Sequence, residues 1–147
     1  MDKLNRYSTW FYAAAIYNAV WGAFVVLWPE GYFKILNLPM PNYMAIWQGM
    51  GMVVGVYALG YWLIARDPVR FGPFVWVGLL GKLFGPIGLV FAGLKGDLPW
   101  SFGWINLTND IIWLPVFIGF SLELVRFERA KMAAEGVEDG LPKTTVI

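Results

Sequence analysis

The chain has 147 residues, of which 59% are hydrophobic and only 14% are charged. In an ordinary water-soluble domain about a quarter of the residues are charged, so this composition indicates a membrane protein whose first partner is the lipid bilayer. The net charge of +1 argues against a nucleic-acid partner, which needs clustered Lys and Arg. Because the chain has no histidine and no cysteine, we expect no metal site and no cofactor.

Four apolar segments follow one another along the chain, at about residues 8–28, 43–65, 72–94 and 102–122. A helix rises about 1.5 Å per residue, so each segment can cross the roughly 30 Å hydrocarbon core. We therefore predict an all-α membrane protein, a bundle of four transmembrane helices with short loops. The bundle is expected to cover residues 1–132, followed by a mobile cytoplasmic tail over residues 133–147. In the longest connection, the amphipathic run 32–38 predicts a short helix on the membrane surface.

The positions of Lys and Arg predict the orientation of the chain, because short cytoplasmic loops retain basic residues. One set of connections and ends carries eight of the 11 basic residues: Lys3, Arg6, Arg66, Arg70, Arg126, Arg129, Lys131 and Lys143. The opposite connections carry Lys34 and Lys95 only. We expect a multi-pass protein of the cell membrane, in a bacterial inner membrane, with both termini cytoplasmic.

Tryptophan and tyrosine are abundant, with nine and seven residues, and several lie where the predicted helices leave the membrane. Aromatic rings with a polar atom favour the interface between lipid and water. We therefore predict interfacial anchors at Tyr7, Trp10, Trp28, Tyr43, Trp47, Trp62, Trp100 and Trp104.

Two ionisable residues, Lys82 and Asp110, lie well inside the third and fourth segments. Counting helical rises from the less basic side places Lys82 about 15–18 Å and Asp110 about 12 Å below the boundary. A lysine side chain can bridge this difference, and a charge within the bilayer needs a partner. We predict that Lys82 and Asp110 form an ion pair.

Polar and small residues recur at helical spacing around this pair, so each set lies on one face of its helix. The polar set comprises Asn106 and Asn109 beside Asp110, Gln48 in the second segment and Asn18 in the first. The glycines, at which helices can pack closely, are Gly51, Gly55, Gly78, Gly81 and Gly85. Three interpretations stay open: a network that only fixes helix packing, one that also contacts a ligand, a lipid head group or a proton, or a contact surface for another membrane subunit.

Two prolines, Pro86 and Pro115, lie close to the charged residues and predict kinks. A proline within a helix leaves the carbonyl four residues earlier without its donor, which here concerns Lys82 and Ile111. Free carbonyls beside a lysine and an aspartate could bind water, an ion or a small polar ligand.

These features suit three classes of function. Because little of the chain lies outside the apolar segments, we favour a non-catalytic accessory or assembly subunit of a larger membrane complex. The alternative is a small transporter or a ligand- or lipid-binding membrane protein that uses Lys82 and Asp110. A transporter this short would need a homo-oligomer to enclose a pathway. Lys and Asp can also serve as bases or acids in an enzyme, but we assign no catalytic residue.

Overall fold

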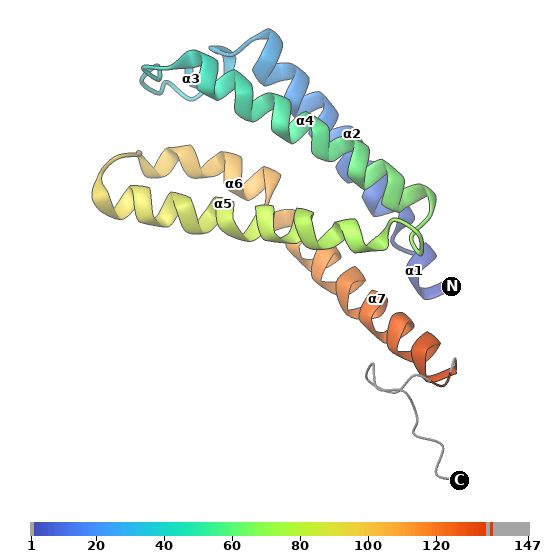
Figure 1. Ribbon diagram of the computed structural model, residues 1–147. Helices are drawn as coiled ribbons and strands as arrows, with labels where there is room; N and C mark the ends of the chain where they lie inside the picture. Colours follow the sequence, from blue (N-terminus) through green and yellow to red (C-terminus); the bar gives the residue numbers. More distant parts are fainter. Residues whose placement is uncertain (1, 135, 137–147) are drawn as a thin grey trace.

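The computed structural model describes residues 2–134 and 136, and all regular structure within them is helical (Figure 1). The α-helices are α1 (Asp2–Asn5), α2 (Ser8–Leu27), α3 (Gly31–Ile35), α4 (Met44–Arg66), α5 (Val75–Lys95), α6 (Trp104–Asn109) and α7 (Leu114–Ala134). Short 3-10 turns are η1 (Gly72–Phe74), η2 (Trp100–Gly103) and η3 (Ile111–Trp113). The all-α prediction is confirmed for these residues. Most of the predicted mobile tail, 133–147, lies outside them.

Three helical stretches are long and apolar enough to cross a membrane: Lys3–Leu27, Met44–Arg66 and Gly72–Lys95. They occupy the first three predicted segments. The proline at position 86 lies inside α5, and the helix continues through it.

The fourth predicted segment is not one helix. Helix α6 ends at Asn109. The backbone angles of the next residue, Asp110, are φ −120° and ψ −62° and depart from helical values, and α7 begins after η3. Pro115 lies in the first turn of α7, where its missing N–H needs no partner. The helix is therefore interrupted at Asp110, before the position at which Pro115 predicts a kink.

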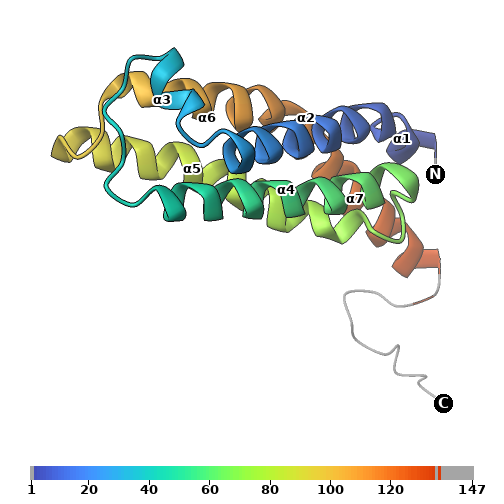
Figure 2. The same ribbon diagram turned by 90° about the horizontal axis from the view of Figure 1, so that it is seen from above.

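The helices form two layers that run roughly along one axis (Figures 1 and 2). Helices α2 and α4 lie side by side in one layer, while α5 and α6 form the other, from which α7 diverges. Gly22 permits the close approach of α2 and α4, since a Cβ there would lie 2.7 Å from the Gly51 carbonyl oxygen and 2.9 Å from Gly55 Cα. Gly51 and Gly55 of α4, which the sequence predicts as packing positions, thus meet Gly22 of α2, which the sequence analysis did not single out.

An aromatic core joins the two layers at the end that carries the N-terminus. Phe11 of α2 packs on Phe117 and Phe120 of α7, with ring centroids 5.0 and 4.9 Å away. Tyr61 of α4 meets Phe117 edge-on at 5.0 Å. All four rings are fully buried, and in lipid such close packing is what holds helices together.

The short helix predicted within 32–38 is present as α3, which packs into the opposite end of the molecule. Tyr32 and Phe33 are buried, and the Tyr32 hydroxyl donates a hydrogen bond to the Phe102 carbonyl at 3.0 Å. Their rings surround Trp47, which is only 5% exposed. The predicted anchoring role of Trp47 is therefore wrong, because α3 covers it.

The other predicted anchors differ in exposure. Tyr7 packs edge-on against Phe120 at 5.7 Å. Exposed rings are those of Trp10, Trp28, Tyr43, Trp62, Trp100 and Trp104.

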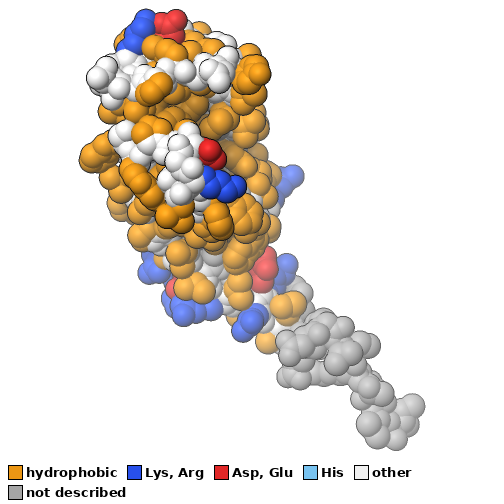
Figure 3. Space-filling model, turned by 90° about the vertical axis from the view of Figure 1, so that its left-hand side faces the viewer, with side chains coloured by type: hydrophobic (Ala, Val, Ile, Leu, Met, Phe, Trp, Pro, Cys, Tyr) orange, Lys and Arg blue, Asp and Glu red, His pale blue; other side chains and the backbone are white. Residues whose placement is uncertain are grey.

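Apolar side chains cover much of the outer surface (Figure 3). Ile16 of α2, Val56 of α4 and Phe84 of α5 are 64–68% exposed, and many neighbours resemble them. A water-soluble monomer rarely exposes a continuous apolar surface of this kind, whereas lipid tails cover it readily. The exposed surface thus agrees with the three candidate membrane spans.

Candidate functional site

The helix break at Asp110 exposes backbone carbonyl groups that side chains then bind. In a continuous helix the Trp113 N–H would donate to the Asn109 carbonyl, but here it donates to the Asp110 carbonyl at 3.1 Å. The Lys82 ammonium donates to the Asn109 carbonyl instead, at 2.5 Å. The Trp113 indole N–H donates to the Thr108 carbonyl at 3.1 Å. Side chains thus replace the missing helical hydrogen bonds within an apolar environment.

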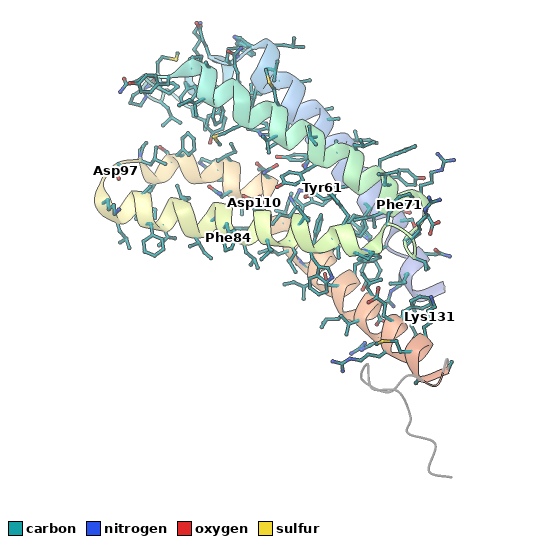
Figure 4. All side chains as sticks on the ribbon, in the orientation of Figure 1. Tyr61, Phe71, Phe84, Asp97, Asp110 and Lys131 are labelled. Atoms are coloured by element: carbon teal, nitrogen blue, oxygen red, sulfur yellow. The ribbon has the colours of Figure 1, made fainter. Side chains whose placement is uncertain are left out.

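Lys82 and Asp110 lie close together, as the sequence predicts. The distance from Lys82 Nζ to Asp110 Oδ1 is 4.0 Å, and both side chains are more than nine-tenths buried. The rings of Tyr61 and Phe117 lie 5.7 and 5.2 Å from the same ammonium nitrogen. Figure 4 shows Tyr61 reaching from α4 toward the layer that contains Asp110. The ammonium is therefore held by a carboxylate, a carbonyl and two aromatic faces.

Two asparagine amides hold the Asp110 carboxylate. Asn106 Nδ2 donates to Oδ2 at 3.0 Å, and Asn109 Nδ2 donates to Oδ1 at 3.2 Å. Gly85 of α5 makes room for this group, because a Cβ there would lie 2.6 Å from Asp110 Oδ2. Hydrogen bonds to the charged oxygens offset the cost of removing them from water.

The structure places Gln48 outside this network. Its amide Nε2 donates at 3.0 Å to the carbonyl of Val26, in the last turn of α2, where helical carbonyls lack intrahelical donors. Gln48 therefore ties α4 to the end of α2. Asn18, in contrast, is buried on the side of α2 that borders Lys82 and Asp110.

A cavity of about 300 Å³ lies between the two layers and borders the charged pair. Its wall includes five of the six predicted polar residues: Asn18, Lys82, Asn106, Asn109 and Asp110. Helix α4 contributes a face that the sequence analysis did not connect with the site: Trp47, Met50, Val54, Tyr57 and Tyr61. These residues recur at alternating steps of three and four, so helical periodicity could have identified them as one face.

The predicted glycines have different surroundings. A Cβ at Gly78 would lie 2.7 Å from the Tyr61 ring and 2.9 Å from the Phe117 ring, so α5 packs tightly there. A Cβ at Gly81 would meet only Tyr57, at 3.8 Å, and one at Gly55 would meet nothing within 4 Å. Gly81 thus borders the cavity with free space in front of it.

A second cavity of about 460 Å³ lies beside the first, toward α3 and the connection between α5 and η2. The two cavities share four side chains in their walls: Trp47, Met50, Leu98 and Phe102. The rings of Trp47 and Phe102 lie 5.9 Å apart at this boundary. The two cavities are therefore neighbours that share an apolar boundary.

Three buried polar atoms in the site have no hydrogen-bond partner among the described residues. They are Asn18 Oδ1, Trp47 Nε1 and Asn109 Oδ1, and each belongs to a residue that lines the first cavity. An unpaired buried polar atom costs about 1–3 kcal/mol, so natural proteins keep few of them without a reason. Each of the three atoms is itself buried, so a molecule in the cavity would reach it only after the side chain moves.

Searches with the chain find no matching family model, no matching curated protein and no matching solved structure.

Proposed function

We propose that the protein crosses the membrane four times, with α2, α4, α5 and the interrupted segment from η2 to α7, and keeps both termini in the cytoplasm. The N-terminus, the turn between α4 and α5, and the end of α7 lie at one end of the molecule (Figures 1 and 4). Most basic residues lie in these three places. Short cytoplasmic segments retain Lys and Arg, which supports this orientation and a bacterial inner membrane.

We propose further that the protein binds a small molecule in the cavity beside Lys82 and Asp110. The observation that carries this proposal is the cavity that borders the buried ion pair, whose wall includes three residues that each keep an unpartnered polar atom. A volume of about 300 Å³ lies at the lower end of the range for ligand pockets. A network that served helix packing alone would gain stability by closing the cavity and pairing these atoms.

The second cavity supports a transport role for the same site. It lies toward the less basic end of the molecule and shares four apolar side chains with the cavity that borders the charged pair. A molecule could reach the site from that side if Trp47 or Phe102 turned aside. The accessory-subunit role and a homo-oligomer stay predictions from the sequence.

The test compares two variants of α5, Gly81→Leu and Gly88→Leu. A leucine at position 81 would extend into the cavity, whereas Gly88 has nothing within 4 Å and does not line it. Each protein is extracted gently and examined by native mass spectrometry. We expect a small-molecule mass on the natural protein and on Gly88→Leu, and its loss from Gly81→Leu.

Other results would favour other roles. A second polypeptide at fixed stoichiometry, with no bound small molecule, would favour the accessory subunit. A small molecule that both variants retain equally would place binding outside the cavity and contradict the proposal.

A further inference from the structure

The second cavity has one charged residue among the described residues that line it, Asp97. This residue is exposed and lies in the turn between α5 and η2. Figure 4 shows it where this turn lies opposite the connection that follows α3. Its carboxylate has no hydrogen-bond or ion-pair partner within residues 2–134. The carboxylate is therefore available to a cation at the edge of the cavity.

The other charged side chains at this end of the molecule do not line the second cavity. Glu30 and Lys34 form an ion pair with each other on α3. Lys95 lies in the last turn of α5, outside the wall. The wall of this cavity therefore carries a negative charge that no residue in the wall balances.

The rest of the wall is mainly apolar and rich in aromatic rings. Phe33 and Trp47 are buried in it, while Tyr43 and Ile46, near the start of α4, are 73% and 65% exposed. An apolar group gains free energy by covering exposed apolar side chains where the helix meets water. Aromatic faces also attract a cation that lies beside them.

We propose that the second cavity is a binding site for a lipophilic cation, with an ammonium group beside Asp97 and an apolar group against Phe33, Tyr43 and Trp47. The cavity volume of about 460 Å³ lies within the range of small-molecule sites. This site is separate from the one proposed beside the buried ion pair, since neither Lys82 nor Asp110 lines it.

The experiment follows methionine methyl groups by NMR in nanodiscs of phosphatidylcholine. Met40 lines the second cavity, so its methyl signal reports binding there. Met52 is 57% exposed and lines neither cavity, so its signal reports partitioning into lipid. Each signal is assigned as the one absent from Met40→Leu or Met52→Leu. The probes are decyltrimethylammonium, 1-decanol and decanoate, which vary the head-group charge at one chain length, and tetramethylammonium, which omits the chain.

We expect decyltrimethylammonium to shift the Met40 signal at concentrations at which the Met52 signal is unaffected. Tetramethylammonium at the same concentrations should shift neither signal, because it has no apolar chain to bury. Equal shifts of Met40 and Met52 would overturn the proposed site. Binding of tetramethylammonium as tight as that of decyltrimethylammonium would overturn the lipophilic part of the assignment.

Two variants that remove the same charge test the role of the carboxylate. An exposed ion pair changes binding by up to about fivefold. We therefore expect Asp97→Asn to bind decyltrimethylammonium about threefold to fivefold more weakly and 1-decanol as tightly as before, while decanoate binds more tightly. Glu128→Gln, at an exposed position near the end of α7, should leave the binding of all probes unchanged.

Each probe is compared across variants, so its own partitioning into lipid cancels. Equal weakening of decyltrimethylammonium binding in Asp97→Asn and Glu128→Gln would show that only the overall charge matters. Equal weakening of decyltrimethylammonium and 1-decanol binding in Asp97→Asn would show a structural effect. Unchanged binding of decyltrimethylammonium in Asp97→Asn would show that the carboxylate takes no part. Each of these results would contradict the proposal.

The two proposed sites fail separately. Gly81 does not line the second cavity, so Gly81→Leu should leave the response of Met40 to decyltrimethylammonium unchanged. If Gly81→Leu retains the bound mass while Asp97→Asn weakens cation binding, the first site is wrong and the second stands. If Gly81→Leu loses the mass and Asp97→Asn binds the cation as before, the second site is wrong and the first stands.

Discussion

Lys82 illustrates how a charged residue is tolerated among apolar helices. Its ammonium has three kinds of partner: the Asp110 carboxylate, the Asn109 carbonyl and the Tyr61 and Phe117 rings. The pair itself was predictable from the depth of the two residues along their segments. The carbonyl and the rings were not, because they depend on the helix break and on the position of α7.

Removing one charge of the pair should be costly. In Lys82→Met the Asp110 carboxylate loses its buried counter-charge, so we expect the free energy of unfolding to fall by about 3–5 kcal/mol. Thermal or detergent-induced unfolding of the purified protein measures this. The exposed pair of Lys34 and Glu30 is the control, since Lys34→Met should cost at most about 1 kcal/mol.

A second variant tests whether the loss comes from the unpaired carboxylate. Combining Lys82→Met with Asp110→Leu should recover most of the stability, because no buried charge remains. A double variant less stable than Lys82→Met would show that the pair contributes more than mutual neutralisation.

At the scale of single elements, the break between α6 and α7 is the feature that shapes the site. The sequence pattern placed Asn106, Asn109 and Asp110 on one face and predicted a kink through Pro115. The observed break lies at Asp110, where side-chain bonds to Lys82 and Trp113 replace the helical ones. The spacing of residues along the sequence identifies which of them share a polar face. The position at which the helix breaks depends on partners from another helix, such as Lys82 of α5.

The packing of α2 against α4 depends on Gly22, and Gly22→Ala tests it. The added Cβ would lie 2.7 Å from a backbone oxygen of Gly51, which cannot move aside without separating the helices. We expect the free energy of unfolding to fall by about 1–3 kcal/mol, measured by thermal unfolding.

Gly49→Ala on α4 is the matched control for this variant. Nothing lies within 4 Å of its Cβ position, so the change should leave stability equal or raise it by up to about 1 kcal/mol through helix propensity. Equal effects of the two substitutions would mean that close packing at Gly22 does not matter.

At the scale of the whole molecule, the cavity lies between two aromatic clusters at which the layers meet, one toward each end. The aromatic core around Phe11, Phe117 and Phe120 holds them together near the N-terminus. Toward the other end, Tyr32 and Phe33 of α3 cover Trp47 and form the second cluster with it.

The orientation in the membrane is tested by labelling, which the absence of cysteine makes straightforward. Arg70→Cys lies in the turn between α4 and α5, and Asp97→Cys lies in the connection between α5 and η2; both positions are exposed. In intact spheroplasts an impermeant maleimide should label Asp97→Cys only, and both variants after lysis. Labelling of both in intact spheroplasts would contradict the proposed topology.

By itself, the sequence determined the all-helical class, the extent of the first three long helices, which are apolar enough to cross a membrane, and the residues that form the buried ion pair. These follow from composition, periodicity and the cost of a lone charge in lipid, all of which act locally along the chain. Only the tertiary structure decided that Gln48 binds the end of α2, that Trp47 is buried, that the fourth segment breaks at Asp110 and that a cavity remains beside it. The physical reason is that these features depend on which side chains from distant segments reach the same unpaired carbonyl or open space.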